Sequence, residues 1–258
     1  MFKLLLQFEW RYHTKQIAFW FSFSIFLFLG LFVGNKGGTG ASENINSPYQ
    51  IAYFIGIMAL LSVFIVTVLG CKAMLRDKDH GMTELVFTTP IKKAQLLYSR
   101  FFGFLMASFV ILCAVPLGML INILFNVSFF PGEQTIGPIE LWPYIWTMLV
   151  LVAPSMFFIA SVMLFIIVVT RSQISAYAVA FSIYGIYFLT SMFTGGPFGG
   201  PITSSPESQA LAALLDPFGL STFVSQTQYF TSPERNTTLL SLSGVFLQNR
   251  ILWIGMGG

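Results

Sequence analysis

The sequence is poor in charge, and this excludes most soluble folds. Asp, Glu, Lys and Arg make up 9% of the 258 residues, whereas 55% are hydrophobic and 17% aromatic. A soluble domain carries about 25% charged residues, because its surface must face water. The composition therefore excludes a soluble enzyme and a disordered tail, and it predicts an integral membrane protein.

Residues that carry chemistry are scarce as well. There are two cysteines, Cys71 and Cys113, and two histidines, His13 and His80. One cysteine lies at a predicted membrane edge and the other within an apolar run, which argues against a disulfide. No P-loop, HExxH, GxSxG or CxxC motif occurs, and the acids around His80 indicate a solvated turn rather than a metal site. The sequence predicts no catalytic residue, metal or cofactor on this chain.

Five apolar runs are long enough to cross about 30 Å of hydrocarbon, which takes roughly 20 residues of helix. They cover residues 16–34, 51–70, 101–125, 141–170 and 174–194. Continuous apolarity lacks the alternation of a barrel strand, so we expect helices. Pro154 lies in the fourth and longest run and predicts a kink or tilt there. The predicted fold is an all-α, polytopic membrane helix bundle that forms a single domain.

A sixth apolar run covers residues 251–258, at the end of the sequence. Eight residues of helix span about 12 Å, which is less than half a crossing. We therefore expect the start of a sixth span in a piece of a longer protein. The alternative is a natural C-terminus with a short interfacial tail.

The basic residues fall mostly on one side of the predicted spans. With the N-terminus in the cytoplasm, three lie outside, namely Lys36, Arg235 and Arg250. The other ten lie inside: Lys3, Arg11, Lys15, Lys72, Arg76, Lys78, Lys92, Lys93, Arg100 and Arg171. The positive-inside rule therefore predicts a multi-pass protein of the cell (inner) membrane with a cytoplasmic N-terminus.

Residues 1–15 have the pattern of an amphipathic helix that lies in the cytoplasmic interface. Polar residues recur every four positions and form one stripe: Lys3, Gln7, Arg11 and Lys15. Apolar residues occupy most of the remaining positions, and we expect Trp10 to anchor at the lipid headgroups. A flexible basic N-terminus is the alternative.

Residues 71–100 form the predicted cytoplasmic loop. It opens with a charged run at residues 76–80, and an apolar face follows at the i, i+3 and i+4 positions Met82, Leu85 and Val86. We expect a short helix there with Asp79 as its N-cap, and a new helix that starts at Pro90. The apolar face fits a partner's groove or the neighbouring helices equally well.

Residues 195–250 form the predicted external segment. Its composition indicates a loop, then short helices over residues 207–215 and 220–229, separated by a turn at residues 216–219. A re-entrant hairpin is conceivable, but Asp216 and several polar neighbours favour helices that rest on the outer surface. Glycosylation sequons begin at Asn126 and Asn236, and whether they are used is open.

The five complete spans contain no Asp, Glu, Lys, Arg or His between their ends. Proton- or ion-coupled carriers keep such groups at mid-membrane depth, and voltage sensors need rows of Arg. No TVGYG-like filter occurs either. These absences argue against an ion-coupled carrier. The chain either moves a substrate passively or has work done on it from outside.

The arrangement resembles the membrane subunit of a type-2 class ABC exporter. The shared features are the interfacial N-terminal helix, the large loop between spans two and three, and helices outside before span six. The loop is similar to the family pattern of a charged stretch, then Gly, Thr, an acid and Leu, then Thr-Pro. The resemblance implies that this loop carries a coupling helix, with these residues at the ATPase contact: Asp77, Asp79, Gly81, Met82, Thr83, Glu84, Leu85, Val86, Thr89 and Pro90.

The resemblance also implies the partners of such a permease. A separate ATP-binding-cassette ATPase in the cytoplasm would hold ATP and Mg²⁺ and hydrolyse the nucleotide. A second permease half or a homodimer would complete the pathway within the lipid bilayer, and no nucleic acid is involved. The direction implied is export. The Phe-rich spans suit a lipid-like or amphipathic cargo, but Phe that faces bulk lipid explains them as well.

A narrower resemblance concerns three segments, residues 215–219, 229–236 and 249–253. They look like the branch of the family whose permease is fused to a C-terminal zinc aminopeptidase-like domain. No peptidase residue occurs in this chain, so nothing catalytic is assigned to it. The alternative function is the membrane anchor of a larger membrane-bound peptidase or other membrane enzyme.

Overall fold

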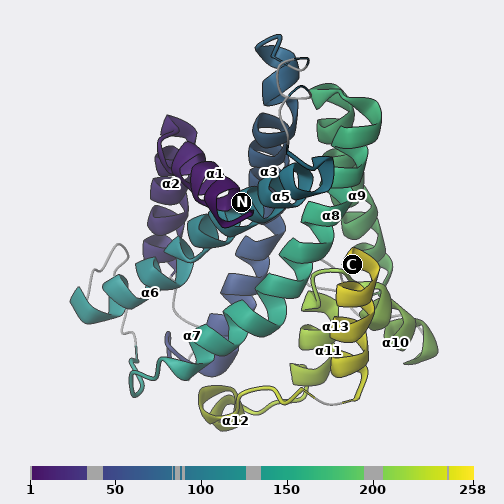
Figure 1. Cartoon of the computed structure of the whole chain (residues 1–258). Coiled ribbons are helices and arrows are strands. Elements are labelled where there is room, and N and C mark those ends of the chain that lie inside the picture. Colours follow the sequence, from purple (N-terminus) through teal and green to yellow (C-terminus); the bar gives the residue numbers. More distant parts are fainter. Residues whose placement is uncertain are drawn as a thin grey trace.

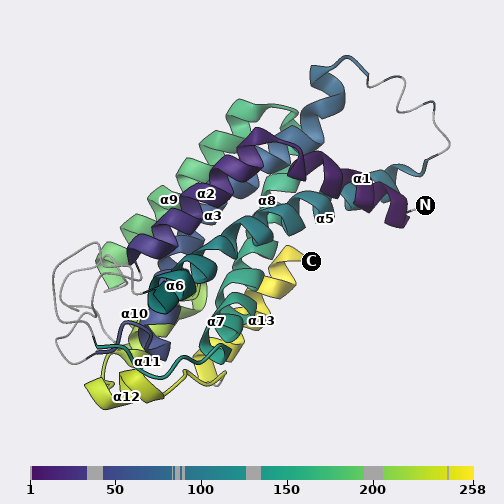
Figure 2. The ribbon, with the colours of Figure 1, turned by 90° about the vertical axis from the view of Figure 1, so that its left-hand side faces the viewer.

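The computed structural model of the chain describes residues 2–33, 43–82, 84, 88, 91–125, 135–194, 206–242 and 244–258. Its regular structure within these ranges is helical, with no strand. The long helices run side by side, with α1 (Phe2–Thr14) across one end. At the other end lie α10 (Pro206–Leu215), α11 (Leu220–Thr227) and α12 (Ser232–Thr237) (Figure 2). The prediction of an all-α polytopic membrane bundle is confirmed.

The five predicted spans correspond to five rods of the bundle. These are α2 (Ile17–Val33), α3 (Pro48–Asp79), α5 (Lys93–Leu112) with α6 (Ala114–Phe125), α7 (Trp142–Thr147) with α8 (Ala153–Thr170), and α9 (Gln173–Thr194). The rods of α3, α5–α6 and α7–α8 are long and apolar enough to cross a bilayer. A fourth crossing results if α1 and α2, bent by 67°, count as one span, while α9 is apolar over the shorter range Gln173–Leu189.

The helices of the bundle pack closely where small residues face each other. A methyl group on Gly30 of α2 would collide with the backbone of Val115 in α6, and one on Gly118 of α6 would collide with the backbone of Leu27. Apolar burial gives little driving force between helices in lipid, so close backbone approach supplies the attraction instead. α3 contacts α5, α8, α9 and α11, and it therefore lies at the centre of the bundle (Figure 1).

The predicted irregularity in the fourth span is present. The π-helical segment η1 (Met148–Val152) joins α7 to α8 and ends just before Pro154. Proline has no backbone N–H and disturbs the hydrogen bonds of the preceding turn. The wider turn is closed by the N–H of Ala153, which donates to the carbonyl of Met148. Local widening of this kind bends a helix without ending it.

α3 extends beyond its predicted span of residues 51–70, and this corrects the reading of the charged run. The helix continues to Asp79, so the charges form its last turns rather than the start of a loop. Asp79 ends a helix and does not cap the start of one. Apolarity reports membrane depth and not the end of a helix, and basic residues are favourable in a last turn.

The end of α3 is fixed by Gly81, which has a φ of +64°. The N–H of Gly81 donates to the carbonyl of Lys78 at 3.1 Å, and that of Met82 donates to the carbonyl of Asp77 at 2.8 Å. This pair of bonds is the Schellman ending, which places glycine in the left-handed conformation. After the loop, α5 begins at Lys93, so it too extends beyond the predicted apolar run.

The turn between α10 and α11 packs into the core of the bundle. Phe218 and Leu220 are buried in the main core. The Phe218 ring contacts that of Tyr187 in α9 at 5.0 Å, and Leu220 packs against Gly56. Gly56 is eight residues into α3, or roughly 12 Å along the helix. The turn between the two short helices therefore packs into the bundle, and the choice between a re-entrant hairpin and helices on the outer surface stays a prediction.

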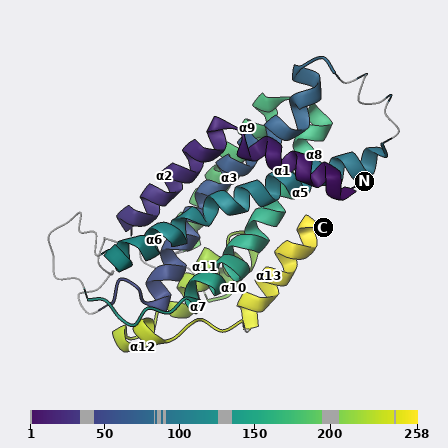
Figure 3. The ribbon, with the colours of Figure 1, turned by 60° about the vertical axis from the view of Figure 1, so that its left-hand side comes forward.

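The last helix, α13 (Gly244–Gly257), begins seven residues before the predicted start at residue 251. It runs beside α8 (Figure 3). The early start brings Asn249 and Arg250 onto the helix, where both are buried. Arg250, which the charge count had placed outside, therefore lies within the protein interior.

Candidate functional site

The end of the bundle crossed by α1 is the candidate functional site, because the predicted docking loop emerges there. Five of the predicted docking residues lie outside the described residues: Thr83, Leu85, Val86, Thr89 and Pro90. The predicted short helix is thus described only at Glu84 and Thr88, which are both helical and exposed.

The described part of the loop faces solvent. Asp79, Gly81 and Glu84 are exposed, and the side chain of Met82 is 53% exposed. The carboxylate of Asp79 accepts a hydrogen bond from the amide of Gln173 at 3.3 Å. These residues lie past the last turn of α3, where a partner could reach an apolar side chain among charges.

Asp77 differs from the other predicted docking residues because it points back into the bundle. Both of its oxygens accept hydrogen bonds from Arg100 of α5, at 2.7 and 2.9 Å. Arg76 donates to both oxygens of Glu9 in α1, at 2.8 and 3.2 Å. We call these four residues the collar. Two carboxylates and two guanidiniums thereby join α1, α3 and α5.

The collar is largely removed from water. Glu9 is 2% exposed, and the Arg76 guanidinium stacks over Tyr12 at 4.5 Å from the ring centroid. Burial of charges costs free energy, which bidentate pairing can offset, whereas loss of one partner leaves an uncompensated charge. The crossed distances are 3.7 Å for Arg100 to Glu9 and 3.9 Å for Arg76 to Asp77. Each guanidinium therefore has a second carboxylate close by.

A glycine allows α1 to approach α5 closely enough for the collar to form. A methyl group on Gly103 would lie 2.6 Å from Cβ of Glu9, which is closer than carbon atoms tolerate. Gly103 lies one turn beyond Ser99 and Arg100 on the buried face of α5. A larger residue at this position would displace α1 together with its carboxylate.

The end of α3 is also tied to the turn between α8 and α9. The ammonium of Lys78 donates to the carbonyl of Arg171 at 2.9 Å. Arg171 has a φ of +48° and turns the chain sharply from α8 into α9. Together with the Asp79–Gln173 contact, this hydrogen bond ties the end of α3, where the loop begins, to the turn between α8 and α9 and to the first residue of α9.

The predicted polar stripe of the N-terminal helix is exposed, at Lys3, Gln7 and Arg11 of α1 and at Lys15 directly after it. The anchoring at the lipid headgroups that was expected for Trp10 stays a prediction. Its ring packs edge-on against Phe19, at 6.4 Å between centroids, and it is half-buried where α1 meets α2. The exposed indole belongs to Trp20, which is 57% exposed and donates to the carbonyl of Thr14.

His13 also stands out in the structure, although no role was predicted for it from the sequence. Its side chain is fully buried, and neither ring nitrogen has a hydrogen-bond partner among the described residues. Burial lowers the pKa of His13 from 6.5 to about 4, and the nearby charges of Arg76 and Lys72 add to this effect. The imidazole is therefore neutral at physiological pH.

Sequence reasoning missed Glu9, Arg100 and Gly103 as parts of the site. Glu9 was visible as a single acid among the apolar positions of an amphipathic helix. Its partner Arg76 is 67 residues away, so only the packing of α1 across α3 and α5 reveals the pair. Gly103 carries no local signal at all.

A second polar cluster lies deep in the bundle, at the hairpin. We call Asp216, Asn249 and Arg250 the interior cluster. The Asn249 amide donates to three carbonyls at the end of α10, those of Ala213, Leu214 and Asp216, at 2.7, 2.8 and 2.9 Å. It therefore satisfies the carbonyls that a helix end leaves unpaired.

Arg250 joins the hairpin to the fourth span. Its guanidinium donates to the carbonyl of Leu151 at 3.3 Å, to the hydroxyl of Ser155 at 3.2 Å and to the carbonyl of Phe218 at 3.4 Å. The Asp216 carboxylate accepts from the N–H groups of Phe218 and Ser221, at 2.8 and 2.6 Å. The five spans alone had indicated an interior without ionisable groups. Asp216 and Arg250 are nevertheless buried there.

Gly219 makes room for this arrangement. It has a φ of +72°, and a side chain there would collide with the guanidinium of Arg250. Both the backbone conformation and the space therefore require glycine. Within the part of the chain that the structure describes, no three His, Cys, Asp or Glu side chains gather in a way that could hold a metal ion.

Comparison with protein-family models matches residues 7–247, almost the whole chain, to the family described as ABC-2 family transporter protein. The comparisons with curated proteins and with solved structures gave no match. The family match does not test the narrower resemblance to the peptidase-fused branch, which stays a prediction.

Proposed function

The chain belongs to the ABC-2 family of transporter proteins, and we propose that this ABC-transporter permease is driven by a separate cytoplasmic ATPase that docks on residues 76–90. In this family the membrane subunit is not catalytic. ATP and Mg²⁺ would be bound by the partner, and the chain would convert the partner's motion into a change of the bundle.

The observation that carries the proposal is the connection between the exposed loop and the collar. Asp79 at the end of α3, and Met82 and Glu84 beyond it, are open to a partner, while Arg76 and Asp77 of α3 are bound to other helices. A force on the loop therefore acts directly on α3 and, through the collar, on α1 and α5.

The four side chains of the collar can pair in two ways, and such a force could switch them from one pairing to the other. In the structure Arg76 pairs with Glu9 and Arg100 pairs with Asp77, and the crossed pairs are less than 4 Å apart. A small shift of α3 along α5 exchanges partners without leaving a charge unpaired. Packed helices change between discrete arrangements of this kind, and the ATPase must bind the two states unequally to shift them.

We further propose that the permease works as an exporter in the cell membrane with its N-terminus in the cytoplasm. The collar end of the bundle gathers the basic residues of α1, of the end of α3 and of the start of α5, in accord with the positive-inside rule. A single permease half seldom lines a pathway alone, so a second half or a second copy completes it.

Replacement of Met82 by Asp tests the docking assignment. We expect Met82→Asp to abolish co-purification of the ATPase subunit encoded with this permease, because it places a charge on the exposed apolar contact. Tyr229→Asp is the matched control, since Tyr229 is 86% exposed at the opposite end of the bundle. Both variants should reach the membrane at wild-type levels. Wild-type recovery of the ATPase with Met82→Asp contradicts the assignment.

A further inference from the structure

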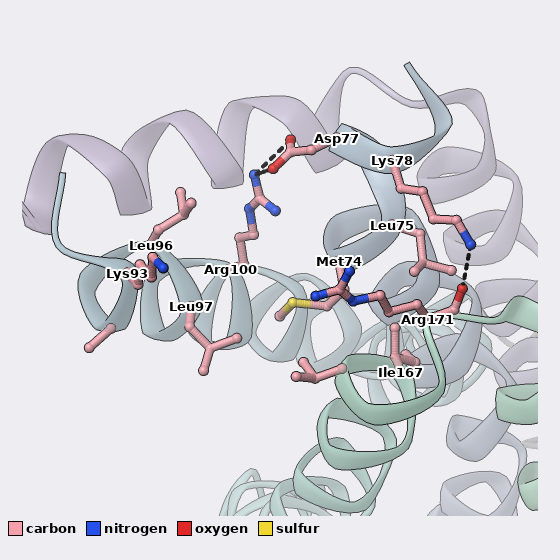
Figure 4. Close-up of a pocket in the computed structure, with 12 residues that line it drawn as sticks. Met74, Leu75, Asp77, Lys78, Lys93, Leu96, Leu97, Arg100, Ile167 and Arg171 are labelled. Atoms are coloured by element: carbon pink, nitrogen blue, oxygen red, sulfur yellow. Dashed lines mark hydrogen bonds and ion pairs between the residues drawn. The ribbon is translucent and has the colours of Figure 1, made fainter. Parts of the chain in front are cut away.

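A pocket of about 460 Å³ opens between α3, α5 and α8 beside the collar (Figure 4). Its volume lies within the range of small-molecule sites, about 300–1,000 Å³. The pocket shares Asp77 and Lys78 with the proposed docking segment 76–90, but the rest of its lining comes from residues outside that segment.

The wall of the pocket is apolar. It consists of Met74, Leu75, Leu96, Leu97, Ile167 and Val168. At its inner side, Ile167 packs against α3 and α5: a methyl group on Gly70 would lie 3.4 Å from Cδ1 of Ile167 and 3.7 Å from the Phe104 ring.

The polar part of the lining is basic. Four cationic side chains, Lys78, Lys93, Arg100 and Arg171, accompany a single carboxylate, Asp77. Arg100 already pairs with Asp77 in the collar. Lys78 donates to the carbonyl of Arg171, and neither Lys78 nor Arg171 forms an ion pair with a carboxylate among the described residues. Figure 4 shows the Arg171 side chain extending across the pocket toward Met74.

Exposed apolar side chains border the pocket on two sides. Val168 lines the pocket and is 45% exposed, and the neighbouring Phe165 and Val169 on α8 are about two-thirds exposed. On the other side, Tyr98 of α5 is 55% exposed beside Leu97. An amphipathic molecule in the bilayer could therefore enter sideways and keep its chain in contact with apolar surface throughout.

We propose that this pocket binds one anionic phospholipid from the leaflet on the collar side of the bilayer. The phosphate lies among Lys78, Lys93 and Arg171, and the upper part of an acyl chain lies on Leu97, Ile167 and Val168. Basic pockets between spans at the membrane surface suit anionic headgroups. A soluble anion would not use the apolar wall, and a neutral lipid would not need the cations.

Native mass spectrometry of the purified chain, titrated with phosphatidylglycerol or phosphatidylcholine, tests the proposal. We expect one phosphatidylglycerol to bind about tenfold more tightly than phosphatidylcholine. The double variant Lys78→Gln with Arg171→Gln should remove this preference. Leu97→Trp should weaken phosphatidylglycerol binding without any change of charge, because it fills the acyl-chain position.

The matched control is Lys72→Gln with Lys92→Gln, which removes two exposed cations adjacent to the same helices but outside the pocket. This variant should keep the wild-type preference. Equal loss in both double variants would show that lipid is held by general surface charge and would overturn the proposal. Displacement of the lipid by millimolar glycerophosphate or inorganic phosphate would overturn it too, since the site would then bind a free anion.

Discussion

The collar and the interior cluster both bury charge between helices, but they satisfy it in different ways. In the collar, side chains pair with side chains, and each guanidinium has a second carboxylate within 4 Å. In the interior cluster, Arg250 and Asn249 donate mainly to backbone carbonyls, and Asp216 accepts from backbone N–H groups.

This difference indicates different mechanical roles. A side chain that bonds to another flexible side chain can exchange partners when helices slide, whereas backbone groups move only with the whole element. The collar therefore suits a joint where a force enters. The interior cluster fastens the hairpin of α10 and α11 to α8 and α13 so that these elements move together.

Loss of Arg250 should give the largest effect. Arg250→Met removes one donor each from the carbonyls of Leu151 and Phe218 and leaves the buried Asp216 without a nearby positive charge, so we expect a loss of about 4 kcal/mol in the free energy of unfolding. Unfolding in mixed micelles measures it. Arg11→Met, on the exposed stripe of α1, should cost no more than about 0.5 kcal/mol.

Two glycine substitutions test how closely the hairpin turn packs against Arg250. Gly219→Ala should destabilise the protein because its Cβ collides with Arg250, while Gly185→Ala in α9 meets open space and should be neutral or stabilising. Equal effects of the two substitutions would contradict the close packing of the hairpin turn.

The collar should tolerate loss of one charge better than the interior cluster does. Glu9→Gln removes a carboxylate that serves Arg76, but Asp77 is 3.9 Å away and can partly replace it. We expect a loss of about 2 kcal/mol, below the range for buried pairs with no substitute. Glu140→Gln, exposed at the other end, is the control. A cost for Glu9→Gln as large as that for Arg250→Met would show that the collar is as rigid as the interior cluster.

The smallest effect concerns pH. The folded-state pKa of His13, about 4, lies below the unfolded value of 6.5, so the unfolded chain takes up the proton first as the pH falls. Stability is therefore lost as the pH drops from 6.5 toward 4. Between about pH 7.5 and about pH 5.5 we expect a loss of about 1 kcal/mol from this group.

Unfolding titrations at the two pH values measure this loss. His13→Leu should remove this part of the pH dependence. Replacement of the exposed His80 by Gln should leave it intact. If His80→Gln abolished the dependence and His13→Leu did not, the burial of His13 as the source of this pH dependence would be disproved.

The sequence predicted the rods of the bundle because apolar runs of membrane length admit only helices. Two predictions that were based on charged residues failed. The run at residues 76–80 suggested a loop although it largely forms the end of α3, and Asp216 suggested an exposed position although it is buried and backbone N–H groups donate to it. A lone charge is costly in a bilayer, and its partners lie in distant parts of the chain. Those partners appear only in the folded structure.

The same limit applies to the site. The exposed part of the docking loop could be located from its charge and its resemblance to the family, but the collar could not. Glu9 pairs with Arg76, which lies 67 residues later in the chain, and the close approach of α1 to α5 depends on Gly103. Tertiary packing of this kind leaves no periodic signal in the sequence.

The most direct test of the account is site-specific photocrosslinking in membranes that contain the permease and its ATPase. A photoreactive residue in place of Met82 should crosslink to the ATPase subunit, and more strongly when a non-hydrolysable ATP analogue closes the ATPase. The same residue in place of Tyr229 should give no such product. Crosslinks from position 229, or none from position 82 while the two proteins co-purify, would contradict the account.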